Sequence, residues 1–196
     1  MIRLSEPRDF EKDLKESNDW VLRNEWIRVC KEIWGETSIV SFKDGLEVQK
    51  GLGTDSTVQQ SNGRRFSVEF KSKRFDLGGY DSWLLEVKHN YYPSSDNYWD
   101  KNKRSCIGGK EGWLYTTTAE FIVYATLSES KKKIIEVCAF SLDPFKYEHF
   151  NSEITKLKKT FASTQFKDKF QVTINAIAPT QWLKENARDY WYWREE

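Results

Sequence analysis

A pair of alternating segments joined by a turn signal sets the framework into which the rest of this chain has to fold. Residues alternate between two faces from Thr54 to Gln60 and again from Arg65 to Ser72, with Ser61-Asn62-Gly63 between them. Alternation over this length is typical of half-buried strands, and a short glycine-containing linker is typical of a hairpin turn. The sequence therefore predicts an antiparallel hairpin near the middle of the chain.

The length of the turn decides which residues of the hairpin face each other. A three-residue loop, Ser61-Asn62-Gly63, brings Asp55 opposite Glu69. A two-residue Asn62-Gly63 turn would instead bring Asp55 opposite Phe70, on the other face. We prefer the three-residue loop because a glycine at its last position suits the left-handed backbone of that loop.

Helix and strand patterns alternate along the rest of the chain. Apolar residues recur at helical spacing from Phe10 to Trp34, and the aromatic tail Asp189–Trp193 is expected to dock on the body of the protein. Further strands are expected at 38–42, 82–88, 113–118, 119–127, 133–141 and 172–178, and helices at 143–150, 152–162 and 181–187. These elements predict one α/β domain over residues 1–196, with a central mixed sheet and helices on both faces.

Net charge and cysteine spacing narrow the function classes. The net charge of +1, from 31 basic and 30 acidic residues, does not by itself indicate a polyanion partner. Basic side chains gather at Lys101–Lys110 and Lys156–Lys169. Each of these clusters either contacts phosphates or forms a solvated face of the protein. The three cysteines are far apart and odd in number, so a structural zinc site is not expected.

The start of the chain and its hydropathy indicate a cytoplasmic protein. Met1–Pro7 is charged and has no apolar core segment, so no signal peptide is expected. No apolar run approaches the length of a membrane span. We therefore expect a cytoplasmic protein with reduced thiols and no membrane partner.

Two carboxylates and a lysine meet in the preferred hairpin register. Glu69 and Lys71 share one face of their strand, and Asp55 lies opposite Glu69. Neighbouring carboxylates repel unless a cation neutralises them, and hard oxygen ligands suit Mg²⁺. A metal at that position, with a lysine beside it, is suited to phosphodiester hydrolysis.

An Asp, a hairpin and then Glu-x-Lys on the return strand resemble the PD-(D/E)XK nuclease superfamily, the restriction-endonuclease-like nucleases. The resemblance covers roughly residues 25–88 and implies that Asp55 and Glu69 bind Mg²⁺ or Mn²⁺ while Lys71 is the catalytic lysine. It further implies a glutamate from the first helix, for which Glu25 is the best candidate. The run Gly53-Thr54-Asp55 departs from the pattern because no proline precedes the aspartate.

A second Glu-x-Lys, Glu86-Val87-Lys88, lies on the 82–88 strand. We prefer Glu69 and Lys71 because their strand is the direct hairpin partner of the Asp55 strand. Glu86 is then an accessory ligand on the neighbouring strand. The alternative, in which Glu86 and Lys88 form the catalytic pair, stays open at this point.

The sequence allows two interpretations for each of two nearby residues, His89 and Trp113. His89 directly follows Lys88 and is either a proton shuttle or a surface histidine at a strand end, which we prefer. Trp113 follows the long segment Asn90–Glu111, which is expected to be a functional or mobile loop. Trp113 either packs near the site or is a core residue, and we prefer the core position.

The expected function is a magnesium-dependent endonuclease that hydrolyses phosphodiester bonds of DNA, duplex or branched, in restriction, defence or repair. RNA stays open as a substrate, because the metal chemistry does not distinguish the sugars. A homodimer would suit cleavage of both strands. The alternative is a non-catalytic nucleic-acid-binding or assembly protein that keeps a nuclease scaffold.

Overall fold

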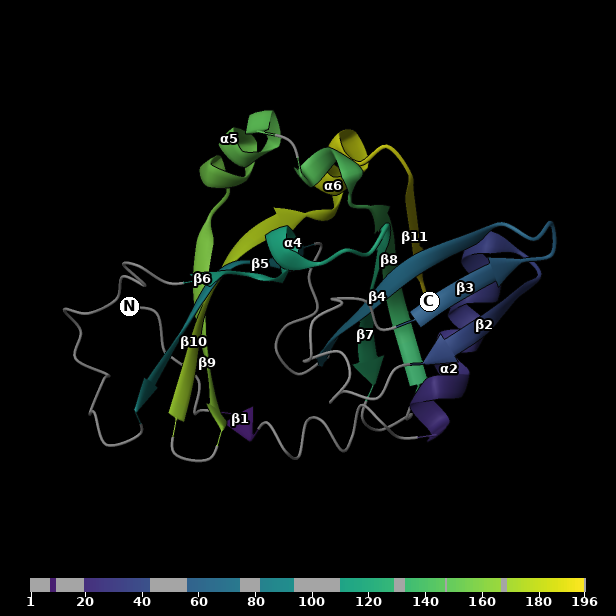
Figure 1. Cartoon of the computed structure of the whole chain (residues 1–196), viewed down its shortest axis with the longest axis horizontal. Coiled ribbons are helices and arrows are strands. Elements are labelled where there is room, and N and C mark those ends of the chain that lie inside the picture. Colours follow the sequence, from purple (N-terminus) through teal and green to yellow (C-terminus); the bar gives the residue numbers. More distant parts are fainter. Residues whose placement is uncertain are drawn as a thin grey trace.

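The computed structural model describes residues 8–9, 20–42, 56–74, 82–93, 110–128, 133–146, 148–166 and 169–195. These residues form a mixed α/β structure that consists mainly of two sheets (Figure 1). The six-stranded sheet contains, in spatial order, β11 (Tyr190–Arg194), β8 (Lys133–Ser141), β7 (Phe121–Ser128), β4 (Arg65–Arg74), β3 (Ser56–Gln60) and β2 (Thr37–Phe42). The five-stranded sheet contains β1 (Arg8–Asp9), β9 (Lys159–Phe166), β10 (Lys169–Pro179), β5 (Ser82–Pro93) and β6 (Lys110–Glu111).

In the part of the chain that the structure describes, five helical segments connect or cover these strands. They are α2 (Trp20–Trp34), α4 (Trp113–Thr116), the 3-10 turn η2 (Asp143–Lys146), α5 (Glu148–Lys156) and α6 (Thr180–Asn186). The six-stranded sheet is mixed, because β4 and β7 run parallel while the other neighbouring strands run antiparallel. None of the described helices has the length and apolar character needed to cross a membrane.

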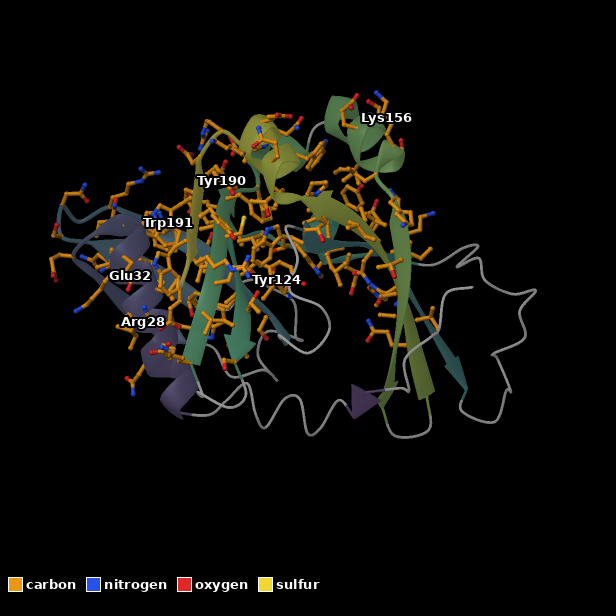
Figure 2. All side chains as sticks on the ribbon, turned by 180° about the vertical axis from the view of Figure 1, so that it is seen from behind. Arg28, Glu32, Tyr124, Lys156, Tyr190 and Trp191 are labelled. Carbon is orange, nitrogen blue, oxygen red and sulfur yellow. The ribbon has the colours of Figure 1, made fainter. Side chains whose placement is uncertain are left out.

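Helix α2 covers one face of the six-stranded sheet. Its side chains Trp26, Val29 and Cys30 are buried in one cluster with Val58 of β3 and with apolar residues of β4, β7 and β8. The Trp26 ring stacks on Phe70, with the ring centroids 4.5 Å apart. Figure 2 shows the charged side chains Arg28 and Glu32 on the same helix. The helix is therefore amphipathic, as the 3.6-residue spacing predicted.

The second sheet packs against the other face of the six-stranded sheet. Trp83 of β5 and Ala176 of β10 share a buried cluster with Ile122 of β7 and Phe140 of β8. The rings of Trp83 and Tyr124 lie 5.2 Å apart, which joins the two sheets directly. Figure 2 shows Tyr124 in the region between them.

The expectation of one central sheet with helices on both faces is therefore corrected. Helix α2 covers one face, but the other face is covered by the second sheet together with residues of α4, α5 and α6. The sequence pattern predicts where strands lie but does not determine which strands pair with each other. The division into two sheets is therefore decided by tertiary contacts.

The hairpin between β3 and β4 has the predicted three-residue loop. The backbone N–H of Gln60 donates to the carbonyl of Arg64 at 2.9 Å, which is the pairing that this loop requires. Gly63 has a φ of 85°, the left-handed conformation that favours glycine. Ser56 pairs with Val68, so the preferred register is confirmed over the described part of the hairpin.

Two predicted elements have a different conformation. Residues 113–118 were expected to be a strand, but Trp113–Thr116 form the short helix α4, which buries Leu114 in the core. Residues 152–162 were expected to be one helix, but α5 ends at Lys156 and β9 begins at Lys159. The Lys159 ammonium donates to the Ile154 carbonyl and, at 2.9 Å, to the Leu157 carbonyl, and so satisfies acceptors at the helix end.

The aromatic tail docks as predicted and forms strand β11, at the edge of the six-stranded sheet next to β8. Tyr192 donates a 2.8 Å hydrogen bond to Glu136, and Trp191 and Trp193 pack against the cluster beneath α2. The expected helix of residues 10–34 is described only from Trp20, and the expected loop 90–111 only at 90–93 and 110–111, where it is strand.

Candidate active site

Strand β4 brings Glu69 and Lys71 to the face of the six-stranded sheet that is turned away from α2. Side chains alternate along a strand, so Phe66, Val68 and Phe70 take the opposite face. Phe66 and Val68 are buried in the cluster beneath α2. The prediction that Glu69 and Lys71 share one face is therefore confirmed.

Glu69 and Lys71 form an ion pair in a largely desolvated position. The Lys71 ammonium contacts Oε1 of Glu69, and Glu69 is only 4% exposed. The other carboxylate oxygen, Oε2, is buried and has no hydrogen-bond partner among the residues that the structure describes. A buried carboxylate oxygen without a partner is costly, and it marks a place where a cation would be favourable.

Glu86 of β5 adds a second carboxylate close to Lys71. Burial raises the pKa of Glu86 above its ordinary value, and the positive charge of Lys71 offsets part of that rise. The backbone N–H of Trp113 and the ring of His89 also hydrogen-bond this carboxylate and favour its ionised form. Nδ1 of His89 lies 3.2 Å from Oε1 of Glu86.

An irregularity in β5 explains how Glu86 and His89 meet. In a regular strand, residues three positions apart point to opposite faces. The pairing of β5 with β10 shifts at this point, because Ile174 pairs with Lys88 while Asn175 pairs with Glu86. The extra residue on β5 is a bulge, which turns the side chains that follow it.

Gly112 and Trp113 connect Glu86 with the ion pair of Glu69 and Lys71. The Gly112 N–H donates to the Val87 carbonyl at 3.0 Å, and the Lys71 nitrogen lies 5.2 Å from the centroid of the Trp113 ring. A Cβ atom on Gly112 would lie 2.3 Å from the Glu86 carbonyl oxygen, so only glycine permits this approach. Trp113 therefore contacts Glu86 through its backbone and Lys71 through its ring.

The structure brings together Glu69, Lys71 and Glu86 but not every residue that the sequence indicated. Asp55, the predicted partner of Glu69, lies outside the described residues, one position before β3. Lys88 is exposed at a strand position that pairs with Glu111. Glu86 therefore belongs to the cluster around Lys71, and Lys88 is not part of it.

Glu25 is held on the other side of the six-stranded sheet. Its carboxylate accepts hydrogen bonds from Arg28, at 3.0 and 3.2 Å, and from the Ile134 N–H, at 2.9 Å. It belongs to α2, which packs on the Phe70 face, whereas Glu69 lies on the opposite face. The structure therefore does not join Glu25 to the Glu69 and Lys71 pair, and it binds the Glu25 carboxylate to Arg28 and Ile134 instead.

Within the described ranges, no three His, Cys, Asp or Glu side chains are grouped to hold a metal ion. His89 and Trp113, for which a surface and a core position were preferred, both contact Glu86. The sequence pattern does not predict either contact. The contact of His89 depends on the bulge in β5, and the contact of Trp113 depends on how α4 packs.

Comparisons with protein-family models, with curated proteins and with solved structures find no match for this chain.

Proposed function

We propose that this protein is a metal-dependent endonuclease, with a restriction-endonuclease-like active site, that hydrolyses phosphodiester bonds of DNA. The observation that carries the proposal is the buried Glu69 carboxylate, which pairs with Lys71 through one oxygen while its other oxygen has no partner among the described residues. The confirmed hairpin register adds support, since it is the register that predicts Asp55 opposite Glu69.

A second buried carboxylate on the same sheet face shows how unusual Glu69 is. Glu136 is 3% exposed, and both of its oxygens accept hydrogen bonds, from Thr126 at 2.6 Å and from Tyr192 at 2.8 Å. Glu136 thus has the full set of partners expected of a buried structural carboxylate. Glu69 lacks one of them, which supports a role in binding a cation.

The chemistry follows from the residue types. Asp55 and Glu69 would hold Mg²⁺ or Mn²⁺ through hard carboxylate oxygens. When bound, the cation supplies Lewis acidity at the scissile phosphate and offsets its negative charge. Lys71 orients the attacking water and stabilises the charge that develops on the phosphoryl oxygens. The ion pair with Glu69 and the contact with Trp113 hold the Lys71 ammonium in place before substrate binds.

The test is cleavage of supercoiled plasmid, linear duplex, single-stranded DNA, a branched junction and RNA, each with Mg²⁺, Mn²⁺ or EDTA. Wild-type protein should cut at least one DNA substrate only when a divalent cation is present. Lys71→Ala, Glu69→Gln and Asp55→Asn should each abolish cutting.

Glu136→Gln is the matched control because it also replaces a buried carboxylate on this sheet face. It should keep metal-dependent cutting if it folds. Metal-dependent cutting that survives Lys71→Ala would contradict the assigned site. Binding of nucleic acid without any cutting would favour the non-catalytic scaffold instead.

A further inference from the structure

We propose that Arg65 binds a backbone phosphate of the DNA substrate, on one side of the scissile phosphate. The inference rests on the proposed nuclease function and adds a substrate-positioning residue to it. Arg65 is the first residue of β4. Because side chains alternate along a strand, Arg65 shares a face with Glu69 and Lys71. A substrate that places its scissile phosphate beside Lys71 therefore has Arg65 further along the same strand face.

The spacing along β4 fits a nucleic-acid backbone. Arg65 and Glu69 are four positions apart in the chain, which corresponds to roughly 13 Å between their Cα atoms in a strand. Each strand of duplex DNA carries one phosphate for about every 3.4 Å of helix axis. A DNA strand that passes the Glu69 and Lys71 pair and continues along β4 therefore brings a second phosphate, roughly three or four steps away, to Arg65.

Arg65 lies at the exposed end of this strand face. Its side chain is exposed, whereas Glu69 is only 4% exposed. Figure 1 shows that the hairpin end of β3 and β4 points away from the five-stranded sheet, while the other end of β4 runs toward it. Strand β4 therefore leads from an exposed arginine to the sheltered ion pair, and a bound backbone can follow that direction.

The guanidinium of Arg65 is oriented but not neutralised. Its Nε donates a 2.9 Å hydrogen bond to Oε1 of Gln59, on the neighbouring strand β3. Its two terminal nitrogens have no partner among the residues that the structure describes. Arg28 and Arg188, by contrast, form ion pairs with carboxylates. A guanidinium with an available planar fork is suited to a phosphate, which it binds through two parallel hydrogen bonds.

The neighbouring Arg64 offers a comparison within the same hairpin. It is also exposed, and it too forms no ion pair with a described residue. Its guanidinium carbon, however, lies 5.8 Å from the ring centroid of Phe66, whose side chain is buried beneath α2 on the other face of the sheet. The two arginines therefore carry the same charge on opposite faces, and a backbone that passes Lys71 meets Arg65 rather than Arg64.

The carboxylate of Glu120 lies beside this path. Its Oε2 accepts a 2.9 Å hydrogen bond from the backbone N–H of Ser67, which lies between Arg65 and Glu69 along β4. Glu120 is exposed, and its negative charge opposes the binding of a phosphate backbone. Glu120→Gln removes the charge and keeps an oxygen that can accept from Ser67. Its effect on DNA binding should therefore be opposite to that of removing Arg65.

The experiment measures binding without cleavage. Fluorescence anisotropy follows a labelled duplex oligonucleotide in EDTA, which prevents metal-dependent cutting, over a series of KCl concentrations. Arg65→Gln should lower the slope of log K against log salt by about 0.9 and weaken binding roughly 5- to 10-fold near 0.1 M salt. Arg65→Lys keeps the charge and should retain most of the slope. Arg64→Gln, the matched control, should stay close to wild type, and Glu120→Gln should bind more tightly.

Cleavage assays separate substrate positioning from catalysis. Arg65→Gln should raise KM for DNA, while kcat at saturating DNA stays within a few fold of wild type. The reason is that a phosphate contact remote from the scissile bond is made equally in the ground state and in the transition state. Thermal unfolding of each variant shows that it is folded under the assay conditions.

A wild-type slope in Arg65→Gln would overturn the inference. Equal losses in Arg65→Gln and Arg64→Gln would overturn it as well, because the charge would then act only at long range. Weaker binding by Glu120→Gln would exclude this path, and so would wild-type protein that does not bind DNA. Wild-type protein that binds DNA without cutting it, with the slope still lowered in Arg65→Gln, would contradict only the nuclease proposal.

Discussion

The Lys71 ammonium nitrogen lies 5.2 Å from the centroid of the Trp113 ring, although Lys71 belongs to β4 of the six-stranded sheet and Trp113 to helix α4, which follows β6 of the five-stranded sheet. The contact is a cation–π interaction, which favours one position of a flexible lysine. The same lysine is paired with Glu69, so its ammonium group is held from two sides.

Replacing Trp113 should therefore impair catalysis through Lys71. A cation–π contact is worth about 0.5–2 kcal/mol, so Trp113→Leu should lower kcat on DNA by roughly 2- to 30-fold. Trp113→Phe keeps an aromatic face and should lose less. Both variants retain the backbone N–H that binds Glu86. A Trp113→Leu protein with unchanged kcat would show that the ring does not position the lysine.

Divalent cations should stabilise the fold through Glu69. A ligand present at ten times its Kd, and bound only by the folded state, adds about 1.4 kcal/mol to the unfolding free energy. The wild-type Tm should therefore rise with Mg²⁺ or Mn²⁺ and return to its starting value with EDTA. Glu69→Gln should show no such rise, and Glu136→Gln should still show it. A Glu69→Gln protein with the full rise would place the cation elsewhere.

The stability contribution of Glu86 should be lost as pH rises. Its pKa is raised in the folded state by burial, so the carboxyl contributes its stability fully below the ordinary value of 4.5. That contribution disappears as pH rises through the raised pKa. In urea unfolding, Glu86→Gln should therefore gain stability relative to wild type between pH 4 and pH 8. A difference that stays constant with pH would contradict the raised pKa.

Glu25 should show the opposite dependence. Burial tends to raise its pKa, but hydrogen bonds from Arg28 and the Ile134 N–H bring the pKa below 4.5. Its contribution is therefore present above the ordinary value and is lost as pH falls through the lower folded value. Glu25→Gln should cost about 1.5–3 kcal/mol at pH 7, the range for hydrogen bonds to a charged group. The cost should shrink in strong acid, whereas cleavage at neutral pH should persist in folded protein.

Gly112 and Gly63 should both resist substitution, for different reasons. Alanine at Gly112 would meet Glu86, with its Cβ 2.3 Å from the carbonyl oxygen and 2.8 Å from Cγ, at an expected cost of about 1–3 kcal/mol. Alanine at Gly63 has open space but must take a positive φ, at about 1–2 kcal/mol. Asparagine tolerates that φ, so Gly63→Asn should recover stability in urea unfolding while Gly112→Asn should not.

Local patterns predicted the part of the candidate site that lies within one hairpin. Alternation along β4 placed Glu69 and Lys71 on one face, and the glycine at the end of the turn predicted the register. Both depend on interactions between residues close in sequence. The structure confirms them for that reason, and the same local logic identified β10 and the short helix α6.

The sequence by itself thus determined most of the strands, the hairpin register and the shared face of Glu69 and Lys71. Only the tertiary structure decided that a second sheet covers their face, that Glu86 and Trp113 lie close to Lys71, and that His89 contacts Glu86. It also decided that Glu25 lies on the opposite face, bound to Arg28 and Ile134. These relations join residues that are distant in sequence, through a bulge, a close approach at Gly112 and sheet packing. No periodicity in the chain encodes such contacts, because they depend on how the completed surfaces fit together.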